Sequence, residues 1–265
     1  MAFDTILYEV ADEIATVTLN RPSKLNAYCP TMGNELVEAM SRADADEGVR
    51  VIIMTGMGRA FCVGADMDVF SQDIKLRESN GSAPPDLRIW TYPTLMQNLK
   101  KPTIAAINGY SLGVGCTITL VCDVRIAAEE AKIGVVFPRV GLITELGSTY
   151  LLPKLIGASN AAMMMLTGRQ FTAQECKDMG LVSYVLPREN LLGKAREIAN
   201  DMLQCSPTSL ALTRRALYAG MNGTIENALQ FEFHANESCF RSAEHKEYVS
   251  SFKEKRKPDF RRLKG

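Results

Sequence analysis

Two glycine-bearing turns contain the residues of this chain that are best arranged for chemistry. The first, residues 58–67, follows the apolar run 51–54, and the second, residues 108–116, follows the apolar run 103–107. Each turn opens a segment of helical pattern, so the two turns can direct two free backbone N–H groups at one point. Preorganised N–H donors stabilise negative charge that develops on an oxygen atom. The pair therefore favours an oxyanion site, whereas either turn alone is weak evidence.

The two turns, in this order, resemble those of the crotonase superfamily, also called the enoyl-CoA hydratase/isomerase family. The resemblance extends from about Ile6 to Phe260. Its other pieces are Leu19-Asn20-Arg21-Pro22, Leu25-Asn26-Ala27, Cys122-Asp123, Gly180-Leu181-Val182 and residues 252–256. It implies an α/β fold, a crotonase-like spiral of strand-strand-helix units with a C-terminal helical region. It also implies an enzyme that acts on acyl-CoA thioesters by stabilising an enolate.

The resemblance assigns the two oxyanion donors to the backbone amides of Ala65 and Val114. Glycine is commoner in the family at the position of Val114. Valine retains the N–H group but makes the turn stiffer and narrows the pocket. A helix over residues 112–121 would direct its positive end at the same point. The alternative interpretation is that the glycines only permit tight turns.

The side chain that moves the proton decides the reaction. Typical hydratases of the family place two glutamates in the pocket, and this sequence has Thr117 and Phe137 at those positions. Neither can act as a carboxylate base, which argues against the two-glutamate hydration mechanism. By resemblance, both side chains line the substrate site.

Glu145 is the carboxylate that stands out near these turns. The family's Δ3,Δ2-enoyl-CoA isomerases carry an acid at this position. The apolar neighbours Leu142, Ile143 and Leu146 predict desolvation, which would raise the pKa of Glu145 and make it a better base near neutral pH. The alternative is that Glu145 caps the following helix, because acids are common in a first helical turn.

Three functions follow from this pattern. The first is an enoyl-CoA isomerase-type double-bond shift with Glu145 as acid and base. The second is a 2-enoyl-CoA hydratase, a lyase, in which Glu145 alone activates water; both activities belong to fatty acid metabolism and β-oxidation. The third is a non-catalytic CoA-binding or scaffold member, which the residues Thr117 and Phe137 motivate.

Binding of CoA is expected to rely mainly on the backbone around the first turn. The resemblance implies a set of residues beside the CoA and along its adenine and pantetheine path: Lys24, Leu25, Ala27, Ala60, Cys62, Asp66 and Met67. Lys24 and Arg59 could meet phosphates, or be plain surface residues. The two histidines, His234 and His245, come late in a charged helical region, which makes a Cys–His enzyme a poor interpretation. We expect no metal and no cofactor, since the CoA thioester is the substrate.

Composition excludes several classes of function. The net charge is zero over 265 residues, so electrostatics favour neither nucleic acid nor a membrane surface. No run of eighteen apolar residues is present, and the first ten residues lack a secretion signal. The seven scattered cysteines form no Cys-x-x-Cys pair, which indicates reduced thiols and a cytoplasmic protein.

Alternating apolar runs and helical patterns predict crossover units and a mostly parallel sheet. We expect strands at 6–10, 14–19, 49–55, 103–107, 124–128 and 181–186. We expect helices after Thr31, near 65–69, over 87–99 with a break at Pro93, over 112–121 and over 161–166. Residues 79–85 are predicted to be a mobile loop.

Two domains are expected: a core, residues 1–190, with the CoA and oxyanion site, and a helical region, residues 191–265. By resemblance the second region forms a homotrimer or a dimer of trimers. The basic tail from residue 252 is either a solvated face or a cover for the CoA site.

Overall fold

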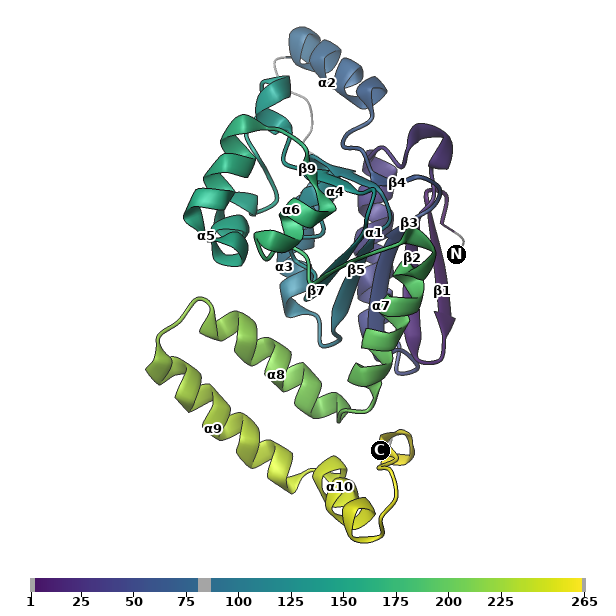
Figure 1. Ribbon diagram of the computed structural model, residues 1–265, viewed down its shortest axis with the longest axis vertical. Coiled ribbons are helices and arrows are strands. Elements are labelled where there is room, and N and C mark those ends of the chain that lie inside the picture. Colours follow the sequence, from purple (N-terminus) through teal and green to yellow (C-terminus); the bar gives the residue numbers. More distant parts are fainter. Residues whose placement is uncertain (1–2, 81–86, 264–265) are drawn as a thin grey trace.

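The computed structural model describes residues 3–80 and 87–263, and these form two sheets (Figure 1). The six-stranded sheet has the order β1-β2-β3-β5-β7-β10 and is parallel apart from the β1–β2 hairpin. Its strands are β1 (Ile6–Ala11), β2 (Ile14–Leu19), β3 (Val51–Gly56), β5 (Thr103–Ile107), β7 (Val124–Ala128) and β10 (Tyr184–Leu186).

The four-stranded sheet has the order β4-β6-β8-β9, with β9 antiparallel to β8. Its strands are short: β4 (Ala60–Cys62), β6 (Tyr110–Leu112), β8 (Lys132–Gly134) and β9 (Phe171–Thr172). The chain passes from the large sheet to the small one three times, as β3–β4, β5–β6 and β7–β8. These repeated passages agree with the strand-strand-helix spiral that the resemblance implies.

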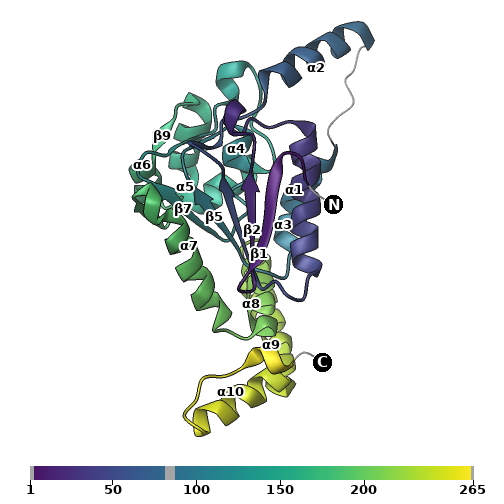
Figure 2. The ribbon, with the colours of Figure 1, turned by 90° about the vertical axis from the view of Figure 1, so that its right-hand side faces the viewer.

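Helices cover both faces of the large sheet (Figure 2). On one face lie α1 (Pro30–Ala45) and α3 (Leu87–Asn98), and on the other lies α7 (Arg188–Leu203). The remaining helices are α2 (Met67–Asn80), α4 (Val114–Thr117), α5 (Ser148–Thr167), α6 (Ala173–Asp178), α8 (Pro207–Gly220), α9 (Ile225–Arg241) and α10 (Ala243–Lys253). Single 3-10 turns are η1 (Pro22–Lys24), η2 (Phe137–Val140) and η3 (Phe260–Leu263).

Strand β3 shows why the central strands are apolar throughout. Ile52 and Met54 pack into the main core, whereas Val51 and Ile53 pack under α7. Because both faces are covered, every position from 51 to 55 is buried, as the continuous apolar run predicted.

Helix α7 belongs to the packing of the sheet. Leu191, Ala195 and Ala199 recur at helical spacing and are buried against the strands. The domain boundary predicted at residue 190 therefore falls inside a helix of the core, and the helices that extend away from it in Figures 1 and 2 begin with α8. From α7 to the end of the described chain no strand occurs, as expected.

Two predicted helices near the site were wrong in extent. The helix predicted over 112–121 is a single turn, α4, because β6 continues to Leu112 and Gly113 has a φ of 55°. The helix expected to start near Ala65 begins at Met67.

The break predicted at Pro93 was also wrong, since α3 continues through this residue. Ile89, Tyr92 and Met96 form a buried stripe at helical spacing in the main core, and this packing outweighs the missing backbone donor of proline. The predicted loop 79–85 begins in α2, with Ser79 and Asn80, and otherwise lies outside the described residues.

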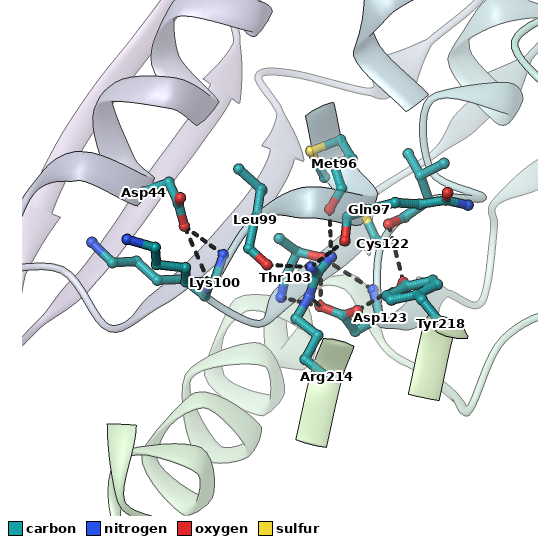
Figure 3. Close-up of polar contacts among 12 residues, drawn as sticks. Asp44, Met96, Gln97, Leu99, Lys100, Thr103, Cys122, Asp123, Arg214 and Tyr218 are labelled. Carbon is teal, nitrogen blue, oxygen red and sulfur yellow. Dashed lines mark hydrogen bonds and ion pairs between the residues drawn. The ribbon is translucent and has the colours of Figure 1, made fainter. Parts of the chain in front are cut away.

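Helix α8 is fastened to the core by a buried polar network (Figure 3). Arg214, 5% exposed, donates to Asp123 at 2.9 Å and to carbonyl oxygens at the end of α3. Tyr218 donates to the second carboxylate oxygen of Asp123 at 2.8 Å, and Thr103 donates to the first through its backbone and its hydroxyl. The charge of Arg214 is thus neutralised where it is buried.

Among the described helices, none is long and apolar enough to span a membrane.

Candidate active site

The two glycine-bearing turns contain two adjacent parallel strands, and both turns continue beyond the same end of these strands. Strand β4 pairs with β6 through Ala60–Tyr110 and Cys62–Ser111, so the chain continues from both strands in the same direction. A Cβ atom on Gly113 would lie 3.7 Å from the Cα atom of Gly64, and one on Gly115 would overlap the carbonyl oxygen of Cys62. Glycine at these positions therefore brings the two turns into contact.

Among the described residues, no acceptor is found for the backbone amides of Ala65 and Val114, which both lie at this contact. By contrast, the N–H of Asp66 donates to the Tyr28 carbonyl at 2.8 Å, and the N–H of Gly113 donates to that of Gly134 at 2.9 Å. Val114 is 3% exposed, so its N–H group lies in a nearly dry environment. Two unpaired donors on touching turns can bind an acceptor oxygen.

A cluster of ion pairs around Asp66 stabilises the first turn, and Asp66 itself is 6% exposed. Arg21 bonds Asp66 Oδ2 at 2.8 Å and also donates to the Ala27 carbonyl, while Lys24 lies 3.7 Å from Asp66 Oδ1. The hydrogen bond from Arg21 lowers the pKa of Asp66 below its ordinary value, against the effect of burial. Asp66 therefore stays ionised, and its ion pairs fix the backbone next to Ala65.

Two buried asparagines position the loop before β4. Asn26 donates to the carbonyls of Met57 and Ala60, and accepts from the N–H of Arg21 at 2.8 Å. Asn108 donates to the Gly58 carbonyl at 2.9 Å. Sequence reasoning assigned no role to Arg21, Asn26 or Asn108, although Arg21 and Asn26 lie in motifs that carry the resemblance.

The residues expected along the CoA path do not all present side chains. Ala60 and Cys62 are fully buried in β4, so only their backbone is available, and burial raises the pKa of the Cys62 thiol to about 12. Ala27 is also buried. Lys24, Arg59 and Met67 are exposed, and Leu25 is half-buried with a φ of 51°.

The positions of the two hydratase glutamates both adjoin the second turn. Thr117 is fully buried, and its hydroxyl donates to the Val114 carbonyl at 3.2 Å. Phe137 begins η2, and its Cζ atom lies 3.9 Å from where a Cβ atom of Gly113 would stand. An apolar ring and an already bonded hydroxyl thus occupy the two positions that the resemblance assigns to the glutamates of a hydratase.

Glu145 lies half-buried between η2 and α5. One expectation about its surroundings was wrong. Leu142 and Ile143 are 47% and 82% exposed, so that Leu146, at 1%, is the buried apolar neighbour among the three. Helix α5 starts at Ser148 with Gly147 at its N-cap, so Glu145 lies outside the first helical turn, in which the alternative interpretation placed it.

The backbone beyond Glu145 is unusual. Leu146 has a φ of 53° and Gly147 a φ of 73°, two left-handed residues in succession. For leucine this conformation costs roughly 1–2 kcal/mol. Strain of this kind persists where the surrounding structure fixes it, and it is often found at functional sites.

The weaker candidates lie elsewhere. Trp90 and Tyr92 are weak candidates for contact with the acyl chain: Tyr92 is buried in the core with its hydroxyl 3.7 Å from the Met54 sulfur, and Trp90 is 53% exposed. His234 and His245 are exposed on α9 and α10, as predicted.

Two cavities, of about 700 and 390 Å³, adjoin the C-terminal segment, and neither is lined by a residue of the two turns. No group of three His, Cys, Asp or Glu among the described residues could hold a metal ion.

Comparison with known proteins agrees with this architecture. Residues 9–263 match the model of the family described as enoyl-CoA hydratase/isomerase. A probable enoyl-CoA hydratase of Mycobacterium tuberculosis is 33% identical over 98% of this chain and 99% of its own. The 1,2-epoxyphenylacetyl-CoA isomerase of Escherichia coli is 33% identical over 96% and 97%. The crystal structure of an enoyl-CoA hydratase from Bacillus anthracis superposes with a TM-score of 0.89 at 33% identity, covering 97% and 99% of the two chains.

The fold and the touching turns define a crotonase-type enzyme. The chain belongs to the enoyl-CoA hydratase/isomerase family.

Proposed function

We propose that this protein is an enoyl-CoA isomerase in which Glu145 moves the proton. The observation that carries the proposal is the set of residues at the second turn: Thr117 and Phe137 replace the glutamates of a hydratase, while Glu145 follows η2. A double-bond shift needs one base and no bound water. The E. coli relative is named an isomerase of another acyl-CoA, an epoxide, which supports isomerisation without added water but not the double-bond shift itself.

The reaction balances with one carboxylate. Glu145 removes a proton from C2 of a 3-enoyl-CoA, and the electron pair moves to the thioester oxygen. The amides of Ala65 and Val114 then stabilise that oxyanion, each contributing about a hundred- to a thousandfold in rate. Protonated Glu145 returns its proton to C4, so that the double bond lies between C2 and C3.

The acyl-CoA is proposed to bind beside the first turn, near Lys24, Leu25, Arg59 and Met67. Since the side chains of Ala27, Ala60 and Cys62 are buried, contacts there would come from the backbone. No metal or further cofactor enters the proposed reaction.

The test is a parallel assay of 3-enoyl-CoA and 2-enoyl-CoA with wild type, Glu145→Gln and Glu129→Gln. Glu129 is an exposed glutamate between β7 and β8 and serves as the control. We expect isomerisation that falls at least about a hundredfold in Glu145→Gln and is unchanged in Glu129→Gln. Hydration that dominates in the wild type would favour the second candidate, a hydratase in which Glu145 activates water. Bound CoA ester without turnover in any variant would favour a scaffold.

We also propose a homotrimer, or a dimer of such trimers, in the cytoplasm. Apolar side chains are exposed along α9 and on α5 and its approach, in particular Ile225, Leu229, Phe233, Ile143 and Leu166. Two separate apolar surfaces on one chain suit a ring in which each copy covers the next. The seven free thiols agree with a reducing compartment. A stable monomer in light scattering would contradict the assembly.

A further inference from the structure

Two hydroxyl groups, those of Thr144 and Ser148, are hydrogen-bonded one after the other to the backbone of Glu145. Ser148 is fully buried, and its backbone N–H and its Oγ donate to the Glu145 carbonyl at 3.0 and 2.7 Å. Ser148 Oγ is also hydrogen-bonded to Thr144 Oγ1. A serine hydroxyl has one hydrogen, which is used on the Glu145 carbonyl, so Thr144 must be the donor to Ser148. The bonds therefore run in one direction, from Thr144 through Ser148 to Glu145.

These bonds close a turn whose left-handed backbone is unfavourable for leucine. Leu146 and Gly147 both have left-handed φ values, and the Leu146 side chain is buried. The two bonds from Ser148 hold the carbonyl of Glu145 on one side of this turn, while Leu146 is held from the other side by packing. These two restraints act on the peptide that follows Glu145, at the backbone from which the Glu145 side chain extends.

We propose that Ser148 is a positioning residue for Glu145, and that Thr144 orients the Ser148 hydroxyl. The inference rests on the proposed function, in which the Glu145 carboxylate must reach C2 and then C4 of one bound acyl chain. A carboxylate that serves two carbons needs a fixed point of attachment, since a displacement of about 1 Å can lower a rate about a hundredfold.

The experiment measures kcat and KM of isomerisation for Ser148→Ala, for the nearly isosteric Thr144→Val, and for both in a Glu145→Gln background. Thr5→Val is the control, because it removes another buried hydroxyl, one that donates to Glu35 before β1. We expect Ser148→Ala to lower kcat about ten- to a hundredfold with KM within about twofold, and Thr144→Val to lower it less. Thr5→Val should retain wild-type kcat.

The Glu145→Gln background separates positioning from general loss of structure. If Ser148 acts through Glu145, Ser148→Ala has no further effect on the residual rate of Glu145→Gln. A wild-type kcat in Ser148→Ala, or an equal loss in both backgrounds, would overturn the inference while the role of Glu145 stands. A wild-type rate in Glu145→Gln itself would instead overturn the proposed base, and the inference with it.

Discussion

Asp66 illustrates how a single residue can support the site without touching the reacting atoms. It is predicted to lie along the CoA path, and its carboxylate is bonded to Arg21 and lies near Lys24. Its backbone N–H is bonded to the Tyr28 carbonyl. The N–H of Ala65, the residue just before it, has no acceptor among the described residues.

The ion pair of Asp66 predicts a pH-dependent stability. Because Arg21 lowers the pKa of Asp66 in the folded state, ionised Asp66 stabilises the fold above about pH 4, the ordinary pKa of an aspartate. That contribution is lost as the pH falls through the lowered pKa. Asp66→Asn should destabilise the protein by about 2 kcal/mol near neutral pH.

Thermal unfolding of wild type and Asp66→Asn from pH 7 downward checks this, and the difference in Tm should shrink in acid. Asp68→Asn is the control, because Asp68 is 75% exposed and its pair with Lys24 lies at the surface. A difference in Tm that grows on acidification would contradict the assignment.

At the scale of elements, the contact between the two turns depends on close backbone approach. Gly115 lies against the Cys62 carbonyl at the start of α4, where no side chain fits. Strands β4 and β6 were not predicted, and they are the elements that place the two turns side by side.

Gly115→Ala should therefore separate the turns and misplace the Val114 amide. We expect kcat to fall about a hundredfold or more, the loss typical of removing one oxyanion donor. Gly193→Ala in α7 is the matched control: nothing lies within 4 Å of its added Cβ, and alanine favours the helix. Equal kcat values for the two variants would show that the turns tolerate separation.

The buried polar network that fastens α8 to the core predicts two changes in the free energy of unfolding. Asp123→Asn leaves the buried Arg214 guanidinium without its charge partner, and should cost about 3 kcal/mol. Tyr218→Phe removes one hydrogen bond to Asp123, and should cost about 1 kcal/mol. Urea unfolding at one protein concentration measures both, and similar losses for the two variants would rule out a buried charge as the main cause.

The whole molecule has a body that contains the turns and a helical arm, α8 to α10, that extends from it (Figure 1). On α9 the exposed residues Ile225, Leu229 and Phe233 recur every fourth position and form one apolar stripe. A stripe of this kind on an extended arm suits contact with another copy of the chain.

Leu229→Asp and Phe233→Asp should therefore dissociate the proposed trimer. Ser238→Asp, an exposed residue of α9 outside the stripe, should leave it intact. Sedimentation over a range of protein concentrations measures the mass. An unchanged mass in both stripe variants would place the interface elsewhere.

Local sequence determined the parts of this protein that depend on local pattern and short motifs. Continuous apolar runs predicted β3 and β5 because both faces of the central strands are buried. The two glycine turns predicted a pair of free N–H donors, and the resemblance to the crotonase superfamily assigned these donors to Ala65 and Val114. The helical end of the chain followed from its amphipathic pattern and the absence of strand signals.

Only the tertiary structure decided features that depend on residues distant in sequence. The strands β4 and β6 are three residues each, too short for a periodic signal, and pairing alone stabilises them. The surroundings of Glu145 looked apolar in sequence, yet Ile143 is exposed, because sequence neighbours on a turn point in different directions. Asp66 was predicted to lie along the CoA path, and only the tertiary structure shows that its carboxylate bonds Arg21, because the fold brings together two residues that are distant in sequence.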